Sequence, residues 1–135
     1  MKIELTDMQF RRLLDLAYVG NWILNSTRGS DRIVEYDEVE TRLFSVAPAH
    51  GMSALTDYKQ GIAVPSAAFE NGGIHEAIAE YEDSVFFEIL AEELARRDMD
   101  FEPISPENYG ELTNRIDEYI EEFEQNGIDN ISLDK

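Results

Sequence analysis

The sequence predicts a single all-α domain in which four main helices form a bundle-like arrangement with helix one at its centre. Two observations support this class. Apolar residues recur at helical spacing in four long segments, and capping or stop residues lie at the ends of those segments. The expected helices are residues 7–27, 31–47, 74–99 and 106–126. A chain of 135 residues without an internal repeat is long enough for one compact core, so we expect one domain over 1–135.

Helix one is the most apolar part of the chain. Residues 13–27 contain one charged side chain, Asp15, although 30% of the whole chain is charged. Apolar side chains point in more than one direction around this helix, and such a helix is usually buried on most sides. Thr6 and Gln9 have the spacing of a capping box, and Gly29 is a stop residue. Helix one is therefore the predicted centre of the core.

The second helix is predicted to begin after the N-cap residue Ser30 and to stop at Pro48. Its apolar residues recur at helical spacing and form one stripe: Tyr36, Val39, Leu43 and Val46. Three acidic residues lie largely on the opposite side: Asp37, Glu38 and Glu40. The apolar stripe is therefore the face that we expect to be buried.

The loop-rich connection at 48–73 carries short and mixed signals. We expect a short helix within Ser53–Gln60 and a further helical turn opened by Pro65 and Ser66. Few compact domains contain a loop-rich connection of this length. It is therefore a natural place for a functional site or for mobility.

The last helix has a specific start signal. Ser105, Pro106 and Glu107 fit an N-cap, a first-turn proline and a first-turn acid, and a glycine follows the end of the helix. Outside the helices, residues 2–5 and 128–135 allow short strands at the two termini.

Composition excludes several classes of function. The chain has no cysteine, which excludes disulfide scaffolds, thiolate zinc sites, iron–sulfur clusters and cysteine nucleophiles. The N-terminal segment lacks the apolar core of a signal peptide, and no apolar run is long enough to span a membrane. We therefore expect a cytoplasmic location and no membrane binding.

The net charge is −18, and residues 71–135 carry four basic and nineteen acidic groups. Such a surface repels nucleic acid and anionic lipid and attracts basic proteins or cations. We therefore expect no direct binding of nucleic acid, and we expect a protein partner that is basic or a second copy of this chain. The last helix carries the candidate acidic surface: Glu118, Glu121, Glu122 and Glu124. The simplest alternative is that this charge serves solubility alone.

Helix one also carries polar and aromatic side chains where apolar ones are expected. Asn21 falls within an apolar face, and a buried amide must be hydrogen-bonded. The residues around it form a candidate pocket or partner-binding patch: Tyr18, Asn21, Trp22, Asn25 and Arg28. The structural alternative is a satisfied core amide, with Gly20 allowing close helix packing.

Metal, cofactor and catalytic motifs are incomplete. The two histidines, His50 and His75, are too few for a ferritin-like di-metal site. The acidic run from Asp98 to Glu102 resembles the first half of a calcium loop, but Pro103 replaces the glycine that the loop requires. We therefore predict no cofactor and no metal. His50 and His75 remain polar candidates for a pocket.

Three functions are compatible with these observations. The preferred hypothesis is a non-enzymatic acidic module that binds another protein. The first alternative is a small enzyme with a site between the 49–73 connection and helix one, using His50, Ser53 or His75. The second alternative is a nucleic-acid mimic whose carboxylates imitate phosphates and occupy a basic protein.

Overall fold

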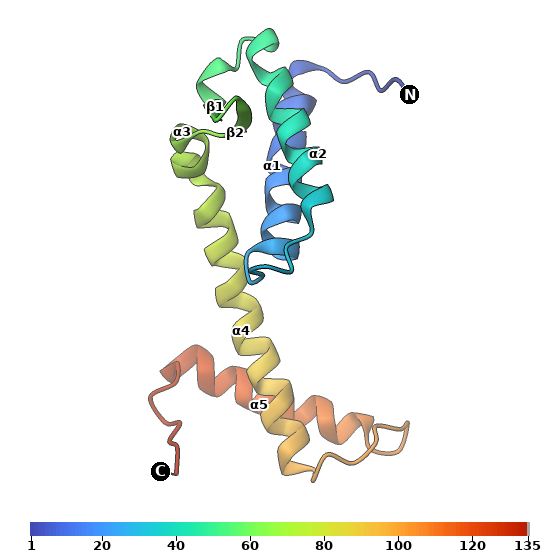
Figure 1. Cartoon of the computed structure of the whole chain (residues 1–135). Coiled ribbons are helices and arrows are strands. Elements are labelled where there is room, and N and C mark those ends of the chain that lie inside the picture. The colour runs from blue at the N-terminus through green and yellow to red at the C-terminus, as the bar shows by residue number, and fades with distance from the viewer. Residues whose placement is uncertain (135) are drawn as a thin grey trace. The chain divides into compact units, whose positions relative to one another are not determined.

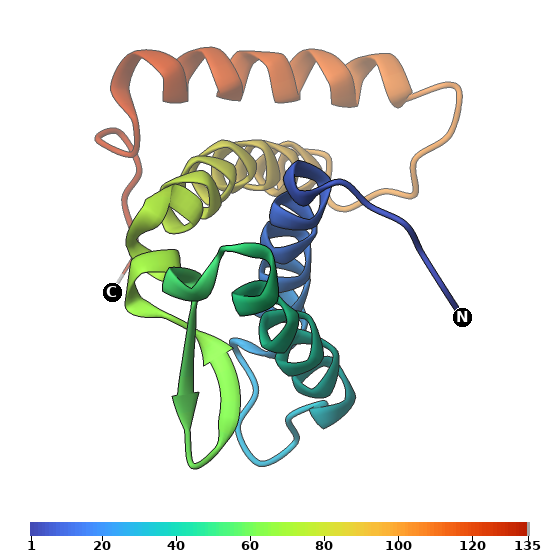
Figure 2. The same ribbon diagram turned by 90° about the horizontal axis from the view of Figure 1, so that it is seen from above.

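The computed structural model describes residues 1–134, and most of these residues are helical, as the sequence predicts (Figures 1 and 2). The chain divides into two compact units, one formed by Met1–Ile78 and one that begins at Ala79. The four long helices are present together with a small two-stranded antiparallel sheet. The bundle-like arrangement of all four helices stays a prediction.

The first unit contains two long helices, α1 (Asp7–Asn25) and α2 (Val34–Val46), which lie side by side in Figure 1. Short elements follow α2 and lead to the first turn of the long helix α4 (His75–Asp98). These short elements are η1 (Ala47–His50), η2 (Ser53–Leu55), β1 (Thr56–Lys59), β2 (Ile62–Pro65), α3 (Ala67–Phe69) and the π-helical turn η3 (Glu70–Ile74).

Helix α1 begins where the sequence predicts. The backbone N–H of Gln9 donates to the Thr6 hydroxyl at 3.1 Å, and the Thr6 N–H donates to the Gln9 side chain at 2.9 Å, which confirms the capping box. The buried side chains fall on one stripe: Leu14, Tyr18, Asn21 and Asn25. Leu16 and Ile23 are 70% and 63% exposed, so the prediction that this helix is buried on most sides is wrong. Its packing partners within the unit cover only the one stripe.

Helix α2 begins later than predicted, because the residues after Ser30 form a turn. The Asn25 side chain accepts a hydrogen bond from the Ile33 N–H at 2.8 Å and holds this turn against α1. The predicted inward stripe is wrong at three of its four positions, since Tyr36, Val39 and Val46 are exposed, and right at Leu43, which is partly buried against the core. The residues that face the core or α1 instead are Asp37, Glu40, Phe44 and Ala47. The asparagines of α1 need polar partners, and the acidic side of α2 supplies them.

The connection contains a β-hairpin that the sequence did not predict. Strands β1 and β2 pair antiparallel, with Lys59 opposite Ile62. Gln60 and Gly61 both have positive φ, 53° and 78°, as the tight two-residue turn requires. The predicted helix within residues 53–60 is therefore limited to η2. The terminal strands are also wrong, because residues 1–6 and 127–134 contain no strand.

The start of α3 confirms the helical turn expected after Pro65. The Ser66 hydroxyl accepts from the Phe69 N–H at 3.1 Å and donates to the carbonyl of Ala54 at 2.6 Å. This cap places the Phe69 ring in the core of the first unit, edge-on to Phe44 at a centroid distance of 4.9 Å. The buried cluster consists of Leu14, Tyr18, Phe44, Ala47 and Phe69.

The second unit contains the rest of α4 and helix α5 (Tyr109–Asn126), which crosses the C-terminal half of α4 (Figure 1). Its buried cluster is small and consists of Ala95, Met99 and Leu112. Helix α5 begins a turn later than predicted, because the Asn108 side chain accepts from the Ser105 N–H at 2.8 Å and closes a preceding turn. The helix ends before Gly127, as predicted.

Candidate functional site

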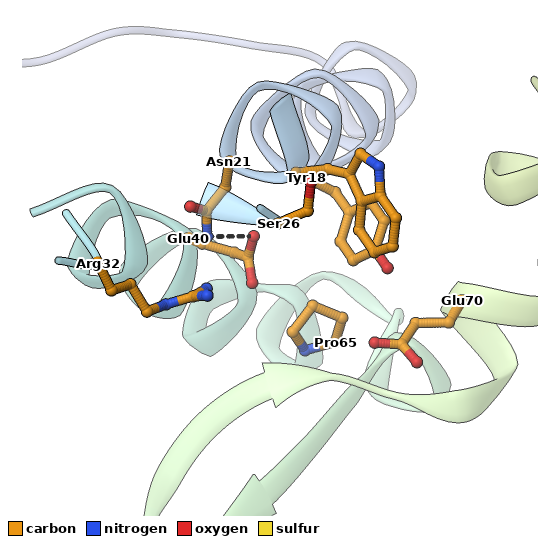
Figure 3. A pocket seen from close by; sticks show the side chains of 8 residues that line it. Tyr18, Asn21, Ser26, Arg32, Glu40, Pro65 and Glu70 are labelled. Atoms are coloured by element: carbon orange, nitrogen blue, oxygen red, sulfur yellow. Dashed lines mark hydrogen bonds between the residues drawn. The ribbon is translucent and has the colours of Figure 1, made fainter. Parts of the chain in front are cut away.

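A hollow of about 350 Å³ lies in the first unit between α1, α2 and the segment at the end of β2 (Figure 3). Its lining residues are Tyr18, Asn21, Trp22, Ser26, Arg32, Glu40, Pro65 and Glu70. Two of these residues, Pro65 and Glu70, belong to the predicted 48–73 connection. The hollow therefore lies between that connection and helix one, where the sequence placed the site of the enzyme alternative.

Asn21 is the centre of a hydrogen-bond network that joins α1 to α2. Its side chain is 6% exposed, and its amide nitrogen donates to Asp37 at 2.9 Å and to Glu40 at 3.0 Å. The Asn25 amide donates to the Asn21 oxygen at 2.7 Å and so fixes the direction of the Asn21 amide. These contacts confirm the prediction of a buried and satisfied amide.

Asn25 belongs to the same hydrogen-bond network but does not line the hollow. Its side chain is 1% exposed, donates to the carbonyl of Ile33 at 3.0 Å and accepts from the Ile33 N–H. Asn25 lies one helical turn after Asn21, so the two amides stack on the same face of α1. The Asn25 contacts tie the loop between α1 and α2 to the end of α1.

Aromatic groups form a second wall of the hollow. The rings of Tyr18 and Trp22 are within 23° of parallel, with centroids 6.3 Å apart. The Tyr18 hydroxyl and the His75 Nε2 are 2.6 Å apart, and the His75 ring is edge-on to Trp22 at 4.8 Å. Burial, followed by the charges of Glu70 and Glu40, raises the pKa of Tyr18 to about 12. The phenol therefore stays protonated at neutral pH.

Two carboxylates face the hollow from different elements. Figure 3 shows Glu40 and Glu70 on opposite sides, with Pro65 between them in the view. Burial raises the pKa of Glu40, against the hydrogen bond from Asn21, which lowers it. Among residues 1–134, neither Glu40 nor Glu70 has a cationic partner within ion-pair distance.

The one cation of the lining is already matched by an acid. The Arg32 guanidinium donates two hydrogen bonds to Asp37, at 2.6 and 2.7 Å. This contact is the main reason that the pKa of Asp37 is lowered and that the pKa of Arg32 is raised. The charges of Arg32 and Asp37 largely cancel, so Glu40 and Glu70 determine the negative potential of the hollow.

The structure brings together some of the predicted site residues and separates others. Tyr18, Asn21 and Trp22 line the hollow, and His75 contacts two of them. Arg28 lies outside it, since its guanidinium donates to the carbonyl of Leu24 at 2.8 Å and to Asp31 at 3.1 Å. His50 also lies elsewhere and contacts Asp7 near the start of α1 at 3.0 Å.

Sequence reasoning missed five lining residues: Ser26, Arg32, Glu40, Pro65 and Glu70. A buried amide on α1 requires acceptors, and the acidic face of α2 was the available source of them. The need of the Asn21 amide for an acceptor on α2 was therefore the one sequence signal for Glu40 as a lining residue. Nothing local indicates Glu70, because the π-helical turn that positions it depends on Gly73, whose φ is +111°.

The candidate acidic surface on α5 is largely solvated. Glu118, Glu121 and Glu124 are exposed. Glu122 is partly covered and accepts hydrogen bonds from Asn126 at 3.1 Å and from Asn130 at 2.5 Å. Within the described part of the chain, these four carboxylates make no ion pair.

The chemistry available in the hollow is cation binding or weak acid–base chemistry. The described residues contain no group of three or more side chains placed to hold a metal ion. The lining has two carboxylates, the Asn21 amide and a protonated phenol, and the phenol hydroxyl of Tyr18 is within hydrogen-bond distance of His75. Glu40 is the carboxylate of the lining whose pKa is raised by burial, and Figure 3 shows it directed to the hollow. A bound cation would satisfy it.

Comparison with protein-family models, curated proteins and solved structures found no significant match. Of the helices in residues 1–134, none is long and apolar enough to cross a membrane.

Proposed function

We propose that this chain is a non-enzymatic interaction module of the cytoplasm that binds a basic partner protein. The observation that supports it is the negative charge left after the chain's own ion pairs are formed. In the second unit every arginine of residues 79–134 is paired: Arg96 with Glu92, Arg97 with Asp98 and Arg115 with Glu111. The remaining carboxylates of residues 79–134 have no ion-pair partner among the described residues, so a cationic partner gains from their field.

The hollow in the first unit supports the same function at short range. Long-range attraction from an acidic surface speeds association, but it gives little selectivity without a shaped contact. The hollow supplies such a contact through two unpaired carboxylates beside an aromatic wall. We therefore treat the acidic surface as the source of attraction and the hollow as the source of recognition.

The test uses the full chain and a labelled Gly/Ser peptide that carries several arginines and lysines, with a glutamate peptide of equal length as the control. Fluorescence anisotropy should show binding of the basic peptide alone at low salt. The affinity should fall steeply between about 0.05 and 0.5 M NaCl, because salt shortens the Debye length. Absence of binding at low salt would reject the proposed function.

A charge variant tests whether the four acidic residues of α5 attract the partner or only keep the protein soluble. Glu118, Glu121, Glu122 and Glu124 are changed together to Gln. A matched variant changes four other exposed acids to Gln: Glu35, Glu38, Glu93 and Glu102. A larger loss of peptide affinity in the first variant assigns the attraction of the partner to α5, whereas equal losses leave α5 a role in solubility only.

A small enzyme is the second candidate, and one observation favours it. The Tyr18 hydroxyl and His75 are within hydrogen-bond distance at the edge of a hollow. Such a pair could move a proton to or from a bound substrate. Turnover of a small substrate that is lost in Tyr18→Phe, with peptide binding unchanged, would favour the enzyme over the interaction module.

A further inference from the structure

The hollow has features that define the kind of cation it fits. Its negative potential comes from Glu40 and Glu70, which belong to different elements and face each other across the cavity. Among residues 1–134, Arg32 makes no ion pair with either glutamate, because the Nε and Nη2 edge of its guanidinium donates to Asp37. A positively charged group that enters the hollow therefore meets two acceptors at once.

The aromatic wall favours a flat cation over a spherical one. The rings of Tyr18 and Trp22 are nearly parallel, and Trp22 is 37% exposed. A guanidinium group is planar, is weakly hydrated and stacks on aromatic faces while its edges donate hydrogen bonds. An ammonium group is compact and strongly hydrated, so it loses more when it leaves water.

The first unit already holds guanidinium groups in both of these ways. Arg32 makes a bidentate contact with the carboxylate of Asp37, and the Arg11 guanidinium lies 5.1 Å from the centroid of the Phe69 ring. The hollow offers both kinds of contact in one place. Its volume of about 350 Å³ leaves room for the stem of a side chain as well as for its charged end.

We propose that the hollow receives the guanidinium group of an arginine side chain of the basic partner, with its flat face against the Trp22 ring that stacks on Tyr18 and its N–H groups directed to Glu40 and Glu70. This assignment rests on the proposed function and adds the residue type that is recognised. Asn21 acts as a positioning residue, because its hydrogen bond holds the Glu40 carboxylate at the edge of the hollow.

The chain contains a built-in reporter for this site. Trp22 is the single tryptophan of the sequence, and it lines the hollow. Its fluorescence is measured while the full chain is titrated with Gly/Ser peptides of equal length and charge that carry either arginines or lysines. The arginine peptide should change the Trp22 emission saturably and bind about five- to tenfold more tightly than the lysine peptide.

Substitutions then locate the contact. Glu70→Gln removes a charge at an exposed position, and Glu40→Gln keeps an acceptor for Asn21. Each should weaken the arginine peptide about three- to tenfold. The control Glu35→Gln removes a charge from an exposed position of α2 outside the lining and should change the affinity less than twofold. Peptide anisotropy provides a second readout for all variants.

Three results would overturn the assignment. The first is anisotropy that shows binding of the basic peptides without any change in Trp22 emission. The second is equal affinity for arginine and lysine peptides together with equal losses in Glu70→Gln and Glu35→Gln. Both leave the proposed function standing and remove the hollow from it. The third is saturation of the Trp22 signal by N-acetylarginine amide as tightly as by the peptide, which would mean a small-molecule ligand in place of a protein partner.

Discussion

The substitution Asn21→Ala tests the network that builds the hollow. Asn21 donates to two carboxylates and accepts from Asn25, and its side chain is buried. Asp37 keeps its two bonds from Arg32 in the variant, and Asn25 keeps its bond to Ile33. The main loss therefore falls on Glu40, whose single hydrogen bond within residues 1–134 comes from Asn21.

The expected cost follows from that assignment. A hydrogen bond to a charged group contributes about 1.5–3 kcal/mol, so Asn21→Ala should destabilise the first unit by about 2–3 kcal/mol at neutral pH. Asn71→Ala makes the same chemical change at an exposed position and should cost less than about 0.5 kcal/mol. Urea unfolding followed by Trp22 fluorescence measures both variants in the unit that contains the substitution.

The cost should also depend on pH. Burial raises the folded pKa of Glu40, so its contribution to stability is present below the unfolded pKa and is lost as pH rises through the folded pKa. Asn21 limits that loss, and its removal raises the Glu40 pKa further. Asn21→Ala should therefore cost more at pH 7 than at pH 4. An equal cost at the two pH values, or a cost below about 0.5 kcal/mol at pH 7, would refute this account of the network.

Three further predictions concern other parts of the fold. Leu14→Ala should destabilise the first unit by about 2–5 kcal/mol, because Leu14 is fully buried. Leu24→Ala should cost less than about 1 kcal/mol, because Leu24 is 37% exposed. Urea unfolding measures both variants. Tyr119→Phe removes the hydrogen bond that is the main cause of the lowered pKa of Asp98. The stability that Asp98 gains from this bond is present above its unfolded pKa and is lost as pH falls through its folded pKa. By circular dichroism the variant should therefore be less stable than the wild type at pH 7 and equal to it near pH 2. Changing Glu118, Glu121, Glu122 and Glu124 together to Gln should raise the melting temperature at low salt and reduce the gain in melting temperature produced by 0.5 M NaCl, because these unpaired carboxylates repel one another; an unchanged response to salt would contradict this.

The helix positions could be predicted because their signals are local. The capping box at Thr6 and Gln9 and the stop at Gly127 act within one helical turn, and both are present in the structure. The start of α2 could not be predicted in the same way. Ser30 has the residue type of an N-cap, but the Asn25 side chain binds the backbone of Ile33 and delays the helix. A contact across eight residues decides that boundary.

The hairpin and the face of α2 depend on still longer contacts. Residues 56–65 lack a common hairpin sequence, because Gln60 is an unusual residue for a turn position that needs positive φ. The face of α2 was assigned from its apolar residues, although Tyr36 and Val39 are exposed. The rule that apolar side chains face inward fails here because α1 presents two asparagines to α2.

The wrong assignment of the buried face of α2 also explains why the sequence predicted three lining residues but neither lining carboxylate. Tyr18, Asn21 and Trp22 lie on one helix, so their spacing places them together before any packing is known. Glu40 and Glu70 reach the hollow only because α2 turns its acidic side to α1 and because Gly73 closes a π-helical turn before α4. Neither condition can be read from a single segment.

The polar contact between α1 and α2 is less stabilising than an apolar contact of similar size would be. A buried hydrogen-bonded carboxylate is seldom more stable than well-packed apolar side chains of similar size. Burial raises the pKa of Glu40, which means that its ionised form costs more free energy in the fold than in the unfolded chain. Asn21 and Asn25 partly offset this cost and fix the carboxylate in one position. A carboxylate that is fixed and poorly solvated binds a cation more strongly than a mobile one in water, because less hydration and less freedom are lost on binding. The same contacts that weaken this helix pair therefore prepare the hollow for a cationic ligand.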